Sequence, residues 1–387
     1  MPEEPLPSRA PTLLGPSVFV GPDLFNPPAP QGWLSITPTF TLSGEFNDNA
    51  FSDNADRKSD FIIGFTPGVT VSAQRPRYRL LGGYYTSGQL STRDGDFDFG
   101  KSHRLFGNFS YQLAPQVQFT LTEAFVKDQD SNAVTIGGSS VGRRDSLRNT
   151  LTPQLRWQAT PSTGLGVLAS YTILRYDDGS DQGTDSDTVR LGVNADHRFT
   201  ARLTGTMDFT AAFLDFEDEP SARTYTLRPG LAYDVTQTLR ASVRIGPSFV
   251  DRDGDWEVRP SVSATLVQAF KFGSLRVGYD RVVTAESGGL TELQSFFAAL
   301  TVPTLVRGLQ LSFIPRYNII ERDLADNDDT EGNNLTLNLR ATYQIARNIS
   351  LIGAYTFFRQ REDRGDRDVD QNRVFLGVQY AFPINFY

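Results

Sequence analysis

Arginine is the residue type in this sequence whose spacing most directly indicates chemistry. Arginines recur on the polar positions of long segments in which apolar and polar residues alternate. A guanidinium group binds carboxylates in a forked geometry, and a low-dielectric wall that carries one sign of charge concentrates counter-ions. If these segments are strands of a barrel, the arginines that point into the lumen are Arg79, Arg104, Arg148, Arg156, Arg190, Arg198, Arg228, Arg240, Arg244, Arg259, Arg276, Arg316, Arg340 and Arg373. The sequence therefore predicts a lumen that favours anions.

Acidic residues are fewer on the same face. By the same alternation they are chiefly Glu45, Asp196, Asp208, Asp234, Glu257 and Asp280. The alternative interpretation is that arginines pair with these acids and with Asn, Gln and Thr, and thereby stiffen the wall. The longest connection, 128–145, adds a second hypothesis: it folds inward and places Arg143 and Arg144 at a constriction.

Other site chemistry is sparse in the sequence. Cysteine is absent, and the only two histidines, His103 and His197, have no partner at a metal-ligand spacing. Acidic stretches such as Asp251-Arg252-Asp253-Gly254-Asp255 do not complete a twelve-residue calcium loop with its terminal Glu. We therefore expect no enzyme activity, no cofactor, no metal site and no nucleic-acid partner.

The alternation itself defines the elements that must position the arginines. No stretch approaches the roughly 18 apolar residues of a membrane-spanning helix, which excludes a helical membrane protein. About eighteen strand-length segments can be followed instead, and an even number is typical of single-chain bacterial barrels. They are 34–46, 60–73, 77–90, 102–113, 116–127, 146–158, 165–176, 187–199, 202–215, 222–234, 238–250, 256–269, 274–285, 292–303, 308–321, 333–345, 348–360 and 371–383. The predicted fold is all-β: a transmembrane, antiparallel, up-and-down barrel of about 18 strands in a bacterial outer membrane.

The connections between the segments support this architecture. Tight turns such as Ala114-Pro115 and Thr200-Ala201 alternate with longer connections that are rich in Asp and Gly. Short periplasmic turns and long external loops follow this pattern, and both chain ends fall on the turn side. We therefore expect both termini in the periplasm.

Two features fit the barrel less well. Seven prolines fall inside strands, although proline removes a ladder donor, and we interpret them as bulges or locally unpaired sites. They are Pro38, Pro67, Pro153, Pro229, Pro247, Pro260 and Pro315. Glu123 and Arg281 also fall on lipid-facing positions, where a bulge, interface depth or a different register would relieve them.

The two ends of the chain differ from the barrel segments. Residues 1–32 are rich in proline and predict an extended periplasmic tail, and the start has no basic and apolar leader, so a removed signal peptide is expected. Residues 33–387 form the predicted barrel. The chain closes on aromatic residues, and Phe386 and Tyr387 are the expected insertion signal.

The strands 36–40 (Ile-Thr-Pro-Thr-Phe) and 65–69 (Phe-Thr-Pro-Gly-Val), the repeat 227–231 (Leu-Arg-Pro-Gly-Leu), the strand count and the aromatic end resemble one known family. It is the outer-membrane barrel family associated with exopolysaccharide biosynthesis and export, of the β-barrel porin 2 type. The resemblance covers about 33–387. It implies a passive conduit for a polysaccharide, and the arginine-rich face suggests an acidic polymer.

Two other functions stay open at this point. One is an anion-favouring diffusion porin for small solutes, and the other is a barrel scaffold that encloses or binds a partner protein. The expected partners are outer-membrane lipids, the barrel-assembly machinery, a polysaccharide and a periplasmic export partner.

Overall fold

The computed structural model describes residues 32–93, 95, 97–130, 143–176, 184–217, 220–286, 289–322, 330–363 and 368–387. Within them, no helix is long and apolar enough to cross a membrane. The proline-rich segment 1–31 lies outside the described residues, so the expected tail stays a prediction.

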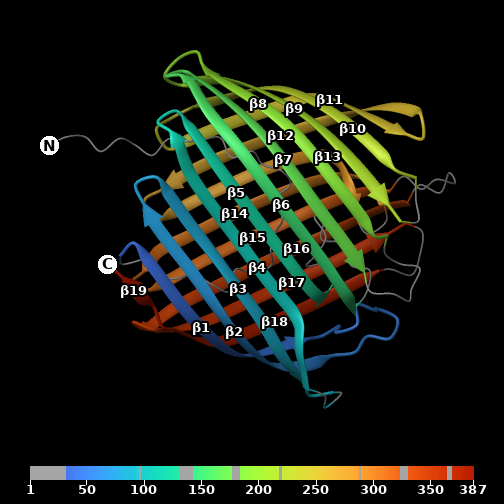
Figure 1. Cartoon of the computed structure of the whole chain (residues 1–387). Coiled ribbons are helices and arrows are strands. Elements are labelled where there is room, and N and C mark those ends of the chain that lie inside the picture. The colour runs from blue at the N-terminus through green and yellow to red at the C-terminus, as the bar shows by residue number, and fades with distance from the viewer. Residues whose placement is uncertain are drawn as a thin grey trace.

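The described chain forms eighteen long strands and one short strand (Figure 1). Their bounds are β1 (Leu34–Asn47), β2 (Asp60–Arg75), β3 (Tyr78–Ser91), β4 (Phe97–Ala114), β5 (Val117–Asp130), β6 (Arg143–Thr160), β7 (Thr163–Tyr176), β8 (Ser186–Arg198), β9 (Leu203–Phe216), β10 (Ala222–Asp234), β11 (Leu239–Arg252), β12 (Asp255–Phe270), β13 (Gly273–Glu286), β14 (Gly289–Val306), β15 (Leu309–Arg322), β16 (Thr330–Ala346), β17 (Ile349–Glu362), β18 (Val369–Ala381) and β19 (Ile384–Phe386).

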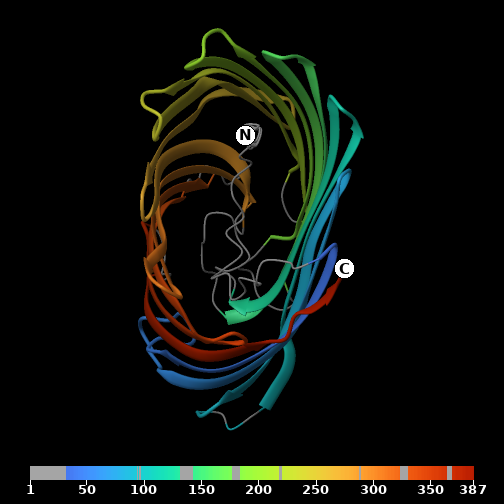
Figure 2. The same cartoon turned by 90° about the vertical axis from the view of Figure 1, so that its left-hand side faces the viewer.

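Each strand pairs antiparallel with its sequence neighbours, and the sheet closes on itself. β1 pairs with β2 on one side and with β18 on the other, and β19 continues the line of β18 along β1. The end-on view shows a closed barrel with an elongated cross-section (Figure 2). The predicted antiparallel barrel of eighteen strands is therefore confirmed, with β19 as a short addition.

The two faces of the wall differ as the alternation predicts. On β16, Leu339, Tyr343 and Ile345 are exposed on the outer face, whereas the inward-facing Asn334 is fully buried. Rings also cluster on the outer face near both ends of the wall: Phe270 stacks on Phe272, and Tyr225 stacks on Trp256. Such rings are typical of the two interfaces of a membrane.

The two ends of the barrel are built differently. At one end, here the turn end, consecutive strands are joined by two to four residues, as between β4 and β5. At the other, the loop end, most connections are longer. The exceptions are the two-residue connections between β11 and β12 and between β13 and β14. The first of them, Asp253-Gly254, has positive φ angles of 53° and 93°, which are those of a tight hairpin turn. The described ends of the chain, near Trp33 and Tyr387, both lie at the turn end, where Trp33 N donates to Phe386 O at 3.0 Å.

The mid-strand prolines interrupt the ladder without shifting it. The β2–β3 pairing passes from Phe65↔Gly88 to Gly68↔Tyr85 in unchanged register, so that Pro67 lies in an unpaired step. Pro229 and Pro247 share one such stretch between β10 and β11. The unpaired interpretation is confirmed there and the bulge interpretation is wrong, because the register shifts of the wall lie elsewhere, for example between Gln112 and Ala114.

The two charged residues that the alternation places towards lipid, Glu123 and Arg281, lie in different environments. Glu123 keeps its outward position, opposite Leu151 on β6, and accepts a hydrogen bond from Asn149. Arg281 does not face lipid, because the end of β13 separates from β12. The β12–β13 ladder stops at Val262↔Arg281, although both strands continue towards the loop end.

Candidate functional site

The predicted lumen arginines all lie on the inward face of the described wall. On each strand they alternate with exposed apolar residues: Arg190 lies between Val189 and Leu191, and Arg244 lies between Val243 and Ile245. Arg198 has the same direction but is exposed at the turn end of β8. These side chains thus share one face of the wall, while their role in lining a pore stays a prediction.

About half of these arginines are paired with carboxylates. The shortest pair joins Arg156 Nη2 to Asp196 Oδ1 at 2.6 Å, and both side chains are largely buried. The other pairs are Arg104–Asp128, Arg240–Asp234, Arg244–Asp208, Arg259–Glu257 and Arg373–Glu45, at 2.8–3.8 Å. This part of the inward face fits the wall-stiffening alternative of paired charges.

A second group lines up across alternate strands as a row of like charges. Arg148 on β6, Arg190 on β8 and Arg228 on β10 form this group, here the cationic row. Arg190 lies within electrostatic range of both of the others, and among the described residues like charges are the only charged neighbours that influence it. Because no described carboxylate influences Arg190, its charge makes this part of the inward face positive.

The cationic row continues into a mixed region on the next strands. Arg228 stands opposite Asp208 in the β9–β10 register, and the carboxylate of Asp208 lies 3.0 Å from Nε of Arg244. Asp280 of β13 interacts electrostatically with both Arg228 and Arg316. One acid thus influences arginines on two strands, β10 and β15.

An aromatic ring holds two further arginines in place. The guanidinium carbons of Arg276 and Arg316 lie 5.8 Å and 5.9 Å from the centroid of the Phe297 ring. This distance is within the range of cation–π attraction. Phe297 therefore orients two cations from β13 and β15 on the inward face.

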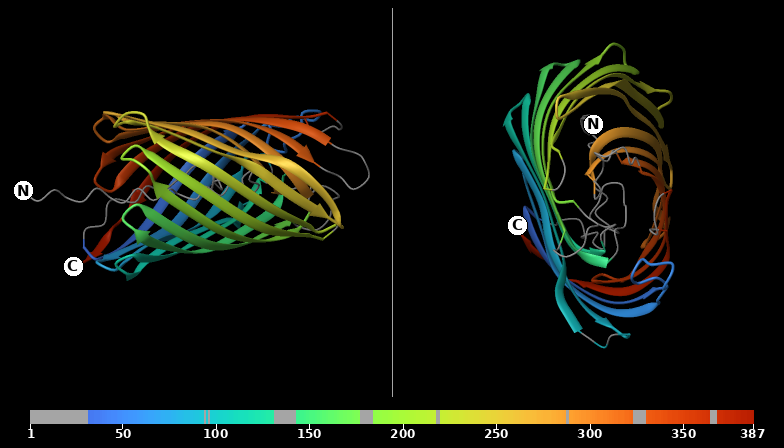
Figure 3. Two further views of the ribbon diagram at one scale, coloured as in Figure 1. Left: turned by 90° about the horizontal axis from the view of Figure 1, so that it is seen from above. Right: turned by 90° about the vertical axis from the view of Figure 1, so that its right-hand side faces the viewer.

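At the loop end, β13 separates from β12 and curves inside the barrel together with β14, which keeps its pairing with β15 up to Thr291↔Arg322. In the right-hand view of Figure 3, their gold-to-orange ribbon runs inside the arc formed by the neighbouring strands. Ala285 and Leu290 are buried there against inward-facing Ala212, Leu214, Phe216, Ala222 and Val250 of β9–β11. We call the described residues 282–286 of β13 and 289–293 of β14 the inner hairpin.

A charge cluster ties the inner hairpin to the wall. Glu292 is 3 % exposed, its Oε1 lies 2.5 Å from Nη2 of Arg281, and its Oε2 lies 3.9 Å from Nη1 of Arg259. Arg259 belongs to β12 and also pairs with Glu257 at 2.8 Å. The carboxylate of Glu292 thus links the hairpin to the strand from which it has separated.

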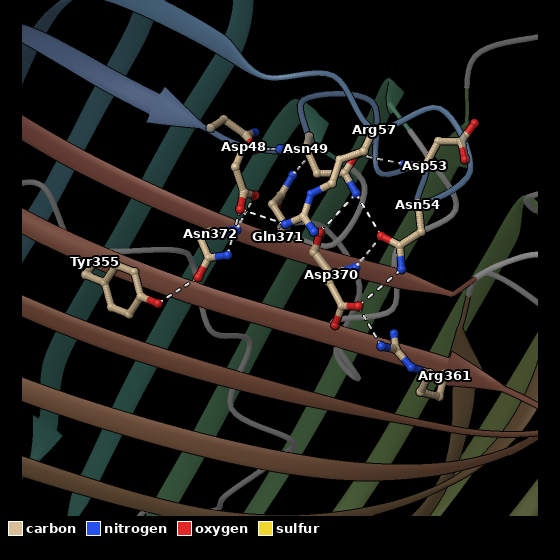
Figure 4. Close-up of polar contacts among 11 residues, drawn as sticks. Asp48, Asn49, Asp53, Asn54, Arg57, Tyr355, Arg361, Asp370, Gln371 and Asn372 are labelled. Carbon is tan, nitrogen blue, oxygen red and sulfur yellow. Dashed lines mark hydrogen bonds and ion pairs between the residues drawn. The ribbon is translucent and has the colours of Figure 1, made fainter.

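A polar network at the loop end joins the first strand to the last. The loop after β1 contributes Asp48, Asn49, Asn54 and Arg57, and β18 contributes Asp370, Gln371 and Asn372; we call these seven residues the clasp (Figure 4). Asp48 accepts hydrogen bonds from the backbone N and the Nδ2 atom of Asn372, both at 2.7 Å, and from Arg57 at 2.6 Å. Burial disfavours its charge, but these hydrogen bonds and the Arg57 charge outweigh burial and lower the pKa of Asp48.

The rest of the clasp is made by amides. Asn49 is fully buried, donates to the carbonyl oxygen of Asp370 at 3.0 Å and accepts from Gln371 at 2.7 Å. Asn54 and Asp370 exchange two hydrogen bonds, and Arg361 of β17 donates to the same carboxylate at 2.6 Å. The clasp therefore extends the closure of the barrel beyond the β1–β18 ladder.

The remaining predicted residues are placed as follows. β6 begins at Arg143, which pairs with Asp130 in the ladder, but the side chains of Arg143 and Arg144 and most of the loop before them lie outside the described residues. The proposed constriction by that loop stays a prediction. Phe386 ends β19 against Leu34, and Tyr387 follows it in an exposed position. Within the described ranges, no group of three or more His, Cys, Asp or Glu side chains could hold a metal ion.

Sequence reasoning missed three contributors. Asp128 falls in the predicted connection 128–145, but it extends β5 and pairs with Arg104. Glu292 lies on the outward positions of β14, as Arg281 does on β13. The opposite charges of Arg281 and Glu292 on lipid-facing positions of adjacent strands could have indicated that this region does not contact lipid. The clasp gave no signal, because its two halves are more than 300 residues apart in sequence.

Comparisons with known proteins agree with this architecture. The family model described as "Putative beta-barrel porin 2" matches residues 149–256, from β6 to the start of β12, which confirms the resemblance for that segment. OccK2 (OpdF) of Pseudomonas aeruginosa in complex with glucuronate is similar in structure, with a TM-score of 0.50 and 13 % identity over 92 % of this chain and 100 % of that chain. A second structure of OccK2 gives a TM-score of 0.50 and 12 % identity over 91 % and 100 %. At such identities the likeness shows the fold alone. No match was found among curated proteins.

Proposed function

We propose that this protein is an outer-membrane porin that lets small solutes diffuse and favours anions. The observation that carries the proposal is the cationic row, in which Arg190 has only like-charged neighbours of electrostatic influence among the described residues. A positive lumen wall raises the local concentration of anions and repels cations.

The substrate that we propose is a small solute, not an exported polysaccharide. The matching family model is described as a porin, and a barrel of the same fold holds the single sugar acid glucuronate. Both support a small solute, and neither supports a polymer. The short turns and the long connections support an orientation with the turn end in the periplasm and the loop end outside.

Planar-bilayer recordings test the proposal. The purified barrel, placed between two concentrations of potassium chloride, should give a reversal potential of the sign expected for chloride preference. Glucuronate in place of chloride should carry current, and more of it than the cation carries. A reversal potential of the opposite sign would reject the anion preference, and the absence of any conductance would reject the porin itself.

A deletion strain distinguishes small-solute uptake from the alternative function, polysaccharide export. If the protein is a small-solute porin, deletion should slow the uptake of sugar acids and leave polysaccharide secretion unchanged. Loss of secreted polymer with unchanged uptake would establish export instead.

A further inference from the structure

We propose that the inner hairpin is the constriction of this channel, and that it exchanges with a position in the barrel wall where it pairs with β12 and widens the lumen. This inference rests on the proposed porin function for its effect on conductance, but the position of the hairpin can be measured independently of conductance.

The first observation is an interrupted wall with complementary edges. The β11–β12 ladder runs through Asp255, whereas the β12–β13 ladder ends at Val262↔Arg281. The last connection there is a side-chain bond, from Ser261 Oγ to the Arg281 carbonyl oxygen at 3.2 Å. Residues 255–261 of β12 and 282–286 of β13 are therefore strand edges that face the same break and have no ladder between them.

The sequence of both edges suits a continuous wall. If the register of Val262↔Arg281 is continued, Val283 comes to lie opposite Pro260, and Ala285 opposite Val258. All four side chains would then share the outward, lipid-facing side, as the alternation requires. Pro260 cannot donate to a ladder, which weakens this pairing and makes separation less costly.

The same apolar side chains are also suited to the folded-in position. Val283, Ala285 and Leu290 pack against the inward-facing cluster of β9–β11, where Leu214 and Leu290 are 2 % and 1 % exposed. One face of the hairpin can thus contact either lipid or this interior cluster. Two packings with comparable burial are what a two-state element needs.

Glu292 favours the folded-in position. Arg281, the last residue of β13 that pairs with β12, adjoins the hairpin, and Arg259 is fixed on β12. The Arg259–Glu292 contact at 3.9 Å therefore joins the wall to the hairpin only when the hairpin is inside. It also places three charged groups where the hairpin narrows the loop end of the lumen.

Two cysteine pairs can report the two positions, because the natural chain has no cysteine. The pair Ala212→Cys with Leu290→Cys reports the folded-in position through their shared cluster, and Val258→Cys with Ala285→Cys reports the wall position. A short bis-maleimide is applied to the full-length barrel in liposomes. Ala341→Cys with Gly353→Cys, register partners in the continuous wall, is the positive control. We expect both test pairs to cross-link, the folded-in pair in the larger fraction.

Single-channel recordings of the cross-linked proteins then test the constriction. The folded-in form should conduct less than the wall-locked form. Glu292→Gln should shift cross-linking towards the wall pair, whereas Glu257→Gln, which removes the other carboxylate partner of Arg259, should shift it much less.

Several results would overturn the inference. Cross-linking of only one test pair would show that the hairpin does not exchange. Equal conductance of the two locked forms would show that it is not the constriction, while the porin function would stand. If the unmodified protein does not conduct at all, the porin function fails, and the cross-linking still decides whether the hairpin moves.

Discussion

The carboxylate of Asp48 accepts two hydrogen bonds from one residue, Asn372, with the backbone N and the Nδ2 atom each 2.7 Å from a different carboxylate oxygen. This arrangement joins the loop after the first strand to the last long strand. The first and last strands meet only when the barrel closes. The clasp therefore stabilises the closed barrel, and no local pattern in the sequence predicts this contact.

Acid should weaken the clasp. The folded-state pKa of Asp48 is below its ordinary value of 3.8, so its stabilising contribution is present above that value and is lost as the pH falls through the folded-state pKa. Asp48→Asn should cost about 1–3 kcal/mol near neutral pH, because hydrogen bonds to a charged group are lost. Thermal unfolding in detergent, followed over a pH series, measures this.

The control for that measurement is Asp56→Asn, in the same loop, whose side chain is 66 % exposed and pairs with Lys58. It should change stability little. If the difference in stability between the wild type and Asp48→Asn stays constant from neutral to strongly acidic pH, the charged carboxylate of Asp48 does not stabilise the clasp.

Removal of one charge from the cationic row should reduce anion preference. Arg190→Gln should lower the anion-to-cation permeability ratio by about twofold or more, because it removes the central charge of the row. Reversal potentials in a salt gradient measure the ratio. Arg202→Gln removes the same charge at an exposed turn, and an equal effect of both substitutions would show that net charge, not the row, sets the preference.

A methyl group at Gly246 should force β10 and β11 apart. A Cβ at this position would lie 1.8 Å from the Leu227 carbonyl oxygen, in the unpaired stretch near Pro229 and Pro247. Gly246→Ala should therefore destabilise the barrel by about 1–3 kcal/mol, as overpacking does. Gly353→Ala is the matched control, since a Cβ there would meet Leu376 Cδ2 at 3.6 Å, an ordinary contact distance. Equal unfolding temperatures of the two variants would refute this expectation.

The Arg156–Asp196 pair should show strong coupling. Both side chains are about 85 % shielded from solvent, so the loss of one partner leaves a poorly solvated charge. In a double-mutant cycle with Arg156→Gln and Asp196→Asn, the double variant should lose less stability than the sum of the single variants, by about 1–3 kcal/mol. Denaturant unfolding measures the cycle, and additive effects would show that the pair contributes no interaction energy.

Much of the barrel could be predicted from the sequence because its signals are local. The alternation on β16 assigns Leu339 and Asn334 to opposite faces without knowledge of any neighbour. Turn and loop lengths then order the strands, and the inward arginines follow from parity alone. The unpaired steps at Pro67 and Pro229 follow equally from the missing donor.

Partner choice could not be predicted in the same way. The alternation predicts that Arg156 and Arg190 face inward. It does not predict that Arg156 pairs with Asp196, or that Arg148 and Arg228 are the charges that influence Arg190. These relationships depend on the stagger of strands around the barrel, which the period of two does not contain.

The sequence by itself thus determined the barrel, its two faces and the arginines of the inner one, because strand period, turn length and side-chain polarity are properties of neighbouring residues. Only the tertiary structure decided that the clasp closes the loop end and that the inner hairpin separates from β12. Both depend on free energies of packing between distant segments. Val283 and Ala285 carry the same apolar pattern whether they face lipid or Leu214, so the pattern alone cannot choose between the two positions.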